Sequence, residues 1–196
     1  MISKYRTAAL LLSFIALGGC QSNPVEAVGE STTPGATAKP PAIKAPTGPN
    51  AITWTAPASF TVAESKGPMR IATYKIAKAE GDADDAELSV TQVGGDVTSN
   101  INRWKGQFDP AAEAEVNERA VGDLKVTVVN LAGTFKGMAM PGAPAGGAKE
   151  NYAMLAAIVV WEGHGDPYFF KLTGPQKTVD AARPAFEELI GSFAHP

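Results

Sequence analysis

The sequence predicts an α+β domain in which an antiparallel sheet is flanked by helices. Two observations support this fold class. Six stretches of strand composition occur along the chain, and neighbouring stretches are joined mostly by turn-forming connections. Two other stretches have the spacing of an amphipathic helix, one between the two groups of strands and one after the last strand. Helices in these two places would cover the sheet.

The predicted strands are rich in β-branched and aromatic residues. They cover residues 60–62, 69–76, 87–93, 124–131, 152–161 and 168–172. Within 87–93, Leu88 and Val90 alternate with Ser89 and Thr91, which indicates one buried face and one polar face.

The strand 69–76 has enough apolar residues on both faces to be covered twice. The strand 152–161 is almost continuously apolar, as expected of a central strand. The acidic run 80–85, which connects 69–76 to 87–93, is expected to be a solvated hairpin loop.

The first helix is predicted from Ile101, Trp104 and Phe108. These residues fall three and four positions apart, so they share one helical face. Thr98 or Ser99 could cap the first turn of this helix, because a short hydroxyl side chain accepts a hydrogen bond from a free backbone N–H.

After this helix, Asp109-Pro110 either ends it or begins a second short one. Residues 111–121 are rich in alanine and glutamate, which predicts another helical turn or two. The last helix is strongly amphipathic, with Pro184 inside the pattern predicting a kink or a loose first turn. Its apolar residues are Val179, Ala182, Phe186, Ile190 and Phe193.

The first 19 residues have the layout of a secretory leader. A basic start with Lys4 and Arg6 precedes an apolar stretch, 8–17, that is too short to span a membrane. The tetrapeptide Leu17-Gly18-Gly19-Cys20 resembles the lipobox of bacterial lipoproteins. That resemblance implies cleavage before Cys20, the only cysteine of the chain, and lipidation of its thiol.

Residues 20–50 are predicted to be the lipidated cysteine followed by a disordered tether. Six prolines lie among Ala, Thr, Gly and Ser without any aromatic residue, so the segment cannot bury enough surface to fold. Residues 51–196 are left for one globular domain of an ordinary size. Gln21, in place of the aspartate that commonly retains lipoproteins at the inner membrane, favours the outer membrane, facing the periplasm, if two membranes are present.

The charge balance argues against nucleic acid as a partner. Loss of Lys4 and Arg6 with the leader leaves 15 basic and 20 acidic residues, a net charge of −5. A nucleic-acid-binding domain is expected to carry a basic patch or stripe.

The C-terminal stretch Tyr168-Phe-Phe-Lys-Leu-Thr-Gly-Pro175, followed by a helix that ends at Phe193, resembles the PsbP-like superfamily. The segment Asn100–Gln107 is also similar to one in uncharacterised bacterial lipoproteins with the same ending. The resemblance covers about Met69 to Phe193 and implies a PsbP-like layered sandwich. It implies an accessory or binding subunit instead of an enzyme, and it transfers no functional residue.

Two places are candidate partner-binding sites. In the first helix, Asn100, Arg103 and Gln107 are expected to form a polar stripe beside the face that carries Trp104, and arginine and tryptophan are favoured in binding hot spots. The alternative is that Trp104 belongs to the core and Arg103 holds a loop in place by hydrogen bonds to backbone carbonyls. The loop 133–149 offers Met138 and Met140, whose flexible side chains suit adaptable apolar contacts, unless the loop is merely a mobile insertion.

No catalytic, metal or cofactor site is predicted. His164 and His195 are the only histidines, which is too few for a metal site or a recognisable hydrolytic triad. We therefore expect a non-enzymatic, lipid-anchored envelope protein that binds another envelope protein. The rival hypothesis is a carrier for a small apolar or amphipathic ligand, suggested by Tyr168, Phe169 and Phe170.

Overall fold

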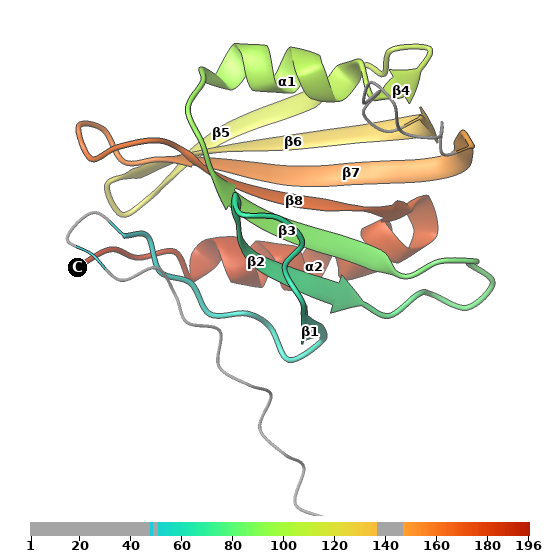
Figure 1. Cartoon of the computed structure of the whole chain (residues 1–196), viewed down its shortest axis with the longest axis horizontal. Coiled ribbons are helices and arrows are strands. Elements are labelled where there is room, and N and C mark those ends of the chain that lie inside the picture. Colours follow the sequence, from blue (N-terminus) through green and yellow to red (C-terminus); the bar gives the residue numbers. More distant parts are fainter. Residues whose placement is uncertain (1–47, 49–50, 137–146) are drawn as a thin grey trace, which may run out of the picture. The chain divides into compact units, whose positions relative to one another are not determined.

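In the computed structural model, which describes residues 48, 51–136 and 147–196, an antiparallel eight-stranded sheet lies between two helices (Figure 1). The predicted α+β fold class is confirmed. The strands are β1 (Phe60–Ala63), β2 (Arg70–Ile76), β3 (Ala86–Gln92), β4 (Phe108–Asp109), β5 (Glu115–Val121), β6 (Leu124–Phe135), β7 (Lys149–Val160) and β8 (Tyr168–Pro175). The helices are α1 (Val97–Lys105) and α2 (Gln176–Gly191).

The strand order is β1-β2-β3-β8-β7-β6-β4, and β5 also pairs with β6. Most neighbours in this order are consecutive in the chain, as expected for hairpins. The exceptions are the pair β4 and β6 and the antiparallel pair β3 and β8, and the latter joins the two groups of strands into one sheet. This non-consecutive pairing brings distant parts of the chain onto one surface.

Helix α2 covers one face of the sheet. Its buried side chains include Val179, Phe186 and Ile190, which pack against inward-facing residues of the strands. Phe170 lies at the centre of this layer, with its ring 5.1 Å from that of Trp54 and 4.6 Å from that of Phe193. The layer is the larger of the two apolar cores among the described residues.

Helix α1 covers the opposite face of the sheet, but only in part (Figure 1). Trp104 is 3% exposed and meets the ring of Phe169 edge to face at 6.0 Å. Met154 and Ile158 of β7 complete this second core. On β2 and β3 the same face carries polar side chains, so the prediction that residues 69–76 are covered by apolar layers on both sides is wrong.

The predicted first helix is present, but its ends differ from the prediction. Its N-cap is Asp96, whose carboxylate accepts a hydrogen bond from the Ser99 N–H at 2.8 Å, instead of Thr98 or Ser99. Phe108 belongs to β4 and reaches the same core as Trp104 from a strand.

The expected helical turns in residues 111–121 are wrong, because the chain there forms β5. Every residue from Glu115 to Ala120 is exposed, so burial imposes no alternation on this edge strand. Backbone pairing with β6, from Glu115 opposite Asn130 to Val121 opposite Leu124, determines its conformation instead. Helix α2 runs unbroken through Pro184.

The loop 80–85 connects β2 to β3 and is largely exposed, as expected of a solvated hairpin loop, and it is also attached to the start of α2. Helix α2 has no side-chain cap of its own at Pro175. Asp82 supplies one from the loop, because its carboxylate accepts hydrogen bonds from the Thr178 N–H at 2.9 Å and from the Thr178 hydroxyl. Lys177 donates to the carbonyl of Glu80 in the same contact.

We expect Asp82→Ala to lower the free energy of unfolding by about 1 kcal/mol, the typical cost of removing a helix cap. Urea unfolding followed by circular dichroism measures the change. Glu80→Ala is the matched control, because it removes a carboxylate from the same loop and keeps the carbonyl that Lys177 contacts. Equal losses in the two variants would show that Asp82 does not act as a cap.

The predicted leader and Cys20 lie outside the described residues, as do residues 49–50 and all of the predicted tether before Gly48. The two described helices are both too short or too polar to cross a membrane.

Candidate functional site

A polar groove crosses the sheet beside α1, on the part of this face that the helix leaves uncovered. It consists of two adjoining hollows that share Arg70, Ser89 and Lys171. The hollow next to α1 has a volume of about 240 Å³ and the other about 310 Å³. Each is at or below the lower end of the range of about 300–1,000 Å³ for small-molecule pockets.

The alternation of β3 and β8 places the side chains of this groove. In β8, Phe170 and Leu172 point to the α2 core, so Lys171 and Thr173 point to the other face. In the register of the sheet, Lys171 lies opposite Ser89 of β3. The polar face that the sequence predicts for 87–93 therefore becomes the floor of the groove.

The hollow beside α1 is positively charged. Its described lining contains three cations, Arg70, Arg103 and Lys171, and no carboxylate. Arg70 forms an ion pair with Glu87 of the adjoining hollow, with 2.6 Å between Nη1 and Oε1. Arg103 donates a hydrogen bond to the neutral side chain of Asn100. Lys171 has no ion-pair partner within the part of the chain that the structure describes.

Burial lowers the pKa of Lys171, because the partly buried ammonium loses contact with water. The nearby charges of Arg70 and Arg103 lower this pKa further, and Glu87 opposes them. The charged form of Lys171 is therefore less favourable in the folded protein than in the unfolded chain. Such an arrangement is unfavourable for stability and is typical of functional sites.

Two buried polar atoms at the groove find no hydrogen-bond partner among the described residues. One is Nε2 of Gln107, a residue that is 3% exposed and lines the hollow beside α1. The other is the hydroxyl of Thr173, which lines the second hollow. A buried polar group without a partner costs about 1–3 kcal/mol, so an acceptor bound in the groove would relieve this cost at Gln107.

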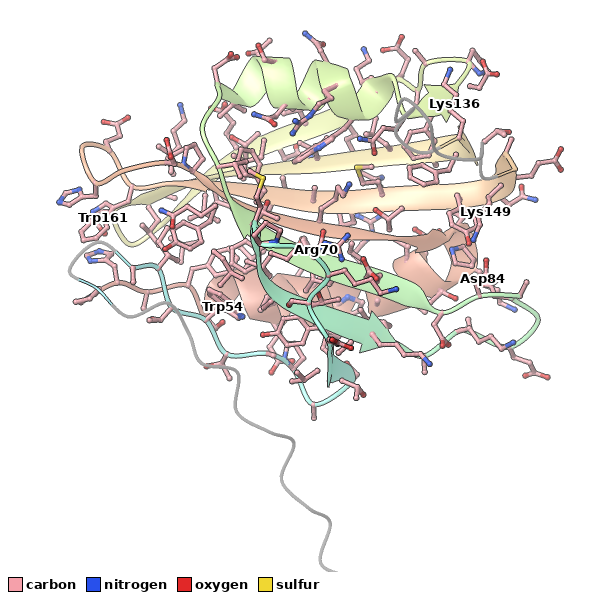
Figure 2. All side chains as sticks on the ribbon, in the orientation of Figure 1. Trp54, Arg70, Asp84, Lys136, Lys149 and Trp161 are labelled. Atoms are coloured by element: carbon pink, nitrogen blue, oxygen red, sulfur yellow. The ribbon has the colours of Figure 1, made fainter. Side chains whose placement is uncertain are left out.

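At its far end the groove carries a cluster in which the charges are matched. Lys149 and Tyr152 both donate to Oδ2 of Asp84, and the Lys149–Asp84 distance is 2.7 Å. These hydrogen bonds lower the pKa of Asp84. Figure 2 shows Asp84 and Lys149 together at one end of the sheet, with Arg70 nearer its middle.

Of the predicted partner-binding residues, Arg103 lies at the groove. Trp104 is buried, so it belongs to the core and supplies an apolar wall of the groove without offering an exposed anchor. Asn100 and Gln107, expected on a surface stripe with Arg103, are also buried. Met138 and Met140 lie outside the described residues.

The aromatic residues that suggested a ligand carrier are used in the two cores. Phe170 packs between Trp54 and Phe193, and Phe169 packs against Trp104. Tyr168 is 2% exposed. Their burial is explained by packing, so these three side chains give the carrier hypothesis no support.

The two histidines line neither hollow of the groove, and both stack on Trp161. The ring of His164 stacks at 3.7 Å from the indole, and the ring of His195 stacks at 3.9 Å. The carboxylate of Asp123, in the turn between β5 and β6, bonds to Nε2 of His195. This contact raises the pKa of His195 and lowers that of Asp123.

The His195–Asp123 pair predicts a pH-dependent stability. Because the folded-state pKa of His195 is raised, its stabilising effect is complete below about pH 6.5 and is lost as the pH rises through the raised value. We expect the difference in Tm between the wild type and His195→Asn to be largest near pH 6. It should shrink as the pH rises through the raised pKa, down to what the stacking on Trp161 contributes. A constant difference between wild type and His195→Asn over this rise in pH would show that the pair does not titrate in this way.

The chain has distant similarity to solved structures. No family model and no curated protein matches the sequence. The chain is similar to cyanobacterial PsbP. The similar structure is the solution structure of cyanobacterial PsbP (CyanoP) from Synechocystis sp. PCC 6803, with a TM-score of 0.45 and 12% identity, over 76% of this chain and 95% of that one. This distant match assigns neither an activity nor a site.

Proposed function

We propose that this protein is a non-enzymatic binding module of the bacterial envelope. Lipid at Cys20 holds it to the membrane, and the groove beside α1 binds an acidic segment of another envelope protein. The observation that carries this proposal is the set of three cations, Arg70, Arg103 and Lys171, in one hollow whose described lining holds no carboxylate.

The shape of the groove favours a polypeptide segment as the occupant. The two hollows are small, and they adjoin through Arg70, Ser89 and Lys171 to make one groove across several strands. An extended chain could place successive side chains in such hollows, since side chains in extended peptides alternate in direction. The second hollow also contains Asp84, Asp85 and Glu87, so charge complementarity would select an acidic side chain at the hollow beside α1.

Met69 is a suitable position for testing the proposal. It lines the hollow beside α1 and is 63% exposed, so a photo-reactive amino acid there would reach a bound partner. Val116 is the matched control position, because it is also an exposed aliphatic residue but lies on β5, at the other edge of the sheet.

The experiment is photo-crosslinking of the full-length protein in cells. We expect a discrete adduct from position 69 and none from position 116. Arg103→Gln should abolish the adduct, while Lys66→Met, which removes an exposed lysine that lines neither hollow, should leave it unchanged. An adduct that forms equally from both positions, or that persists in Arg103→Gln, would contradict the proposed surface.

The membrane anchor is a separate part of the proposal. Cys20→Ser should move the protein from the membrane fraction to the soluble fraction, because the acceptor of the lipid is lost. Unchanged membrane fractionation of Cys20→Ser would refute lipid anchoring and leave the groove proposal intact.

A further inference from the structure

We infer that the hollow beside α1 binds a single carboxylate group, held between Lys171 and Arg103 with Gln107 as a third donor. The inference rests on the proposed function only in assigning that carboxylate to the acidic segment of a partner protein. It names the chemical group that the groove recognises and the residues that recognise it.

The positive charge that has no partner among the described residues lies at the hollow beside α1. Arg70 and Glu87 form an ion pair, so their charges offset each other. Arg103 is bonded to a neutral amide oxygen and Lys171 has no ion-pair partner among the described residues. Both line the hollow beside α1, so this hollow is where an anion gains most.

The amide of Gln107 also indicates an anion in this hollow. Gln107 is 3% exposed and lines the hollow, and its Nε2 has no hydrogen-bond partner among the described residues. A ligand oxygen would give Gln107 the acceptor that the described part of the chain does not provide. A buried donor and two cations at one hollow together indicate an oxygen acceptor with negative charge.

The hollow also has an apolar wall, which suits the hydrocarbon part of the group that carries this acceptor. Trp104, Phe169 and Val93 form an apolar wall beside the charged groups. A carboxylate on a short chain of methylene groups, as in a glutamate side chain, would place its apolar part on this wall and its oxygens among the donors. The donors of Arg103, Lys171 and Gln107 could together bind the two oxygens of a planar carboxylate.

The test is an NMR titration of the full-length protein in detergent micelles at constant ionic strength. The signal observed is the ε-methylene of Lys171 in protein with ¹³C-labelled lysine, and the two probes are propionate and inorganic phosphate. Propionate should shift the Lys171 signal saturably and raise the pKa of Lys171, because a bound anion favours the charged ammonium. Phosphate should bind more weakly.

Two variants distinguish a specific site from general attraction to positive charge. Arg103→Gln should weaken propionate binding at least about tenfold, as expected for the loss of a charged hydrogen bond. Gln107→Leu keeps a side chain of similar size and should also weaken it without loss of folding. Lys66→Met should leave the titration unchanged.

The result can also separate this inference from the proposed function. No shift at Lys171, equal binding by Arg103→Gln, or tighter binding of phosphate than propionate would overturn the carboxylate assignment. Propionate binding without a crosslinked partner at position 69 would uphold the assignment and refute the protein-binding function. A crosslinked partner without propionate binding would uphold the protein-binding function and refute the carboxylate assignment.

Discussion

Phe170→Ala is expected to lower the free energy of unfolding by about 3–5 kcal/mol, the usual cost of truncating a large aromatic side chain in a core. Phe170 is fully buried in β8, the strand that joins the two halves of the sheet. Its ring contacts Trp54 before β1 and Phe193 after α2. Truncation would leave a cavity where three distant segments of the chain meet.

Urea unfolding followed by circular dichroism would measure this loss. Val116→Ala is the control, because Val116 is 44% exposed and a surface truncation should change stability by less than about 0.5 kcal/mol. A loss below about 1 kcal/mol for Phe170→Ala would mean that Phe170 does not fill the α2 core between Trp54 and Phe193.

Gly174→Ala is expected to destabilise the protein by about 1–3 kcal/mol or more, through overpacking. A Cβ atom at Gly174 would lie 2.5 Å from Cβ and 2.8 Å from Cα of Ala86, in the neighbouring strand β3. Because backbone atoms are involved, the clash cannot be relieved by a side-chain rotation alone. The strands β3 and β8 would have to separate locally.

Gly191→Ala is the matched control for this prediction. Nothing lies within 4 Å of a Cβ atom at Gly191, so this substitution should be neutral or slightly stabilising. Combining Gly174→Ala with Ala86→Gly should recover part of the lost stability, because the nearer of the two clashes disappears. Strict additivity of the two changes would show that the residues do not meet.

The elements with strong apolar periodicity could be predicted from the sequence. Leu88 and Val90 of β3, and the row from Val179 to Ile190 in α2, lie on the faces that their spacing indicates. β5 could not be predicted in this way, because its exposed residues show no burial pattern and β6 alone holds it in the sheet. Local composition there favours a helix, and tertiary pairing overrides it.

The candidate groove could be predicted only in part. The helical spacing points to Arg103, but Arg70 and Lys171 come close to it only through the pairing of β3 with β8. That pairing joins strands that are not consecutive, so no local pattern indicates it. The one available signal is Lys171 itself, a charged residue within the aromatic strand Tyr168–Leu172.

If the groove cations serve binding and not stability, Lys171→Met separates the two roles. The decisive experiment measures two properties of this one variant, its free energy of unfolding and its crosslinking from position 69. Because folding lowers the pKa of Lys171, removing its charge should leave the protein at pH 7 as stable as the wild type or more stable. We predict that stability is kept and the adduct is lost. A less stable variant that still forms the adduct would contradict a binding role for these cations.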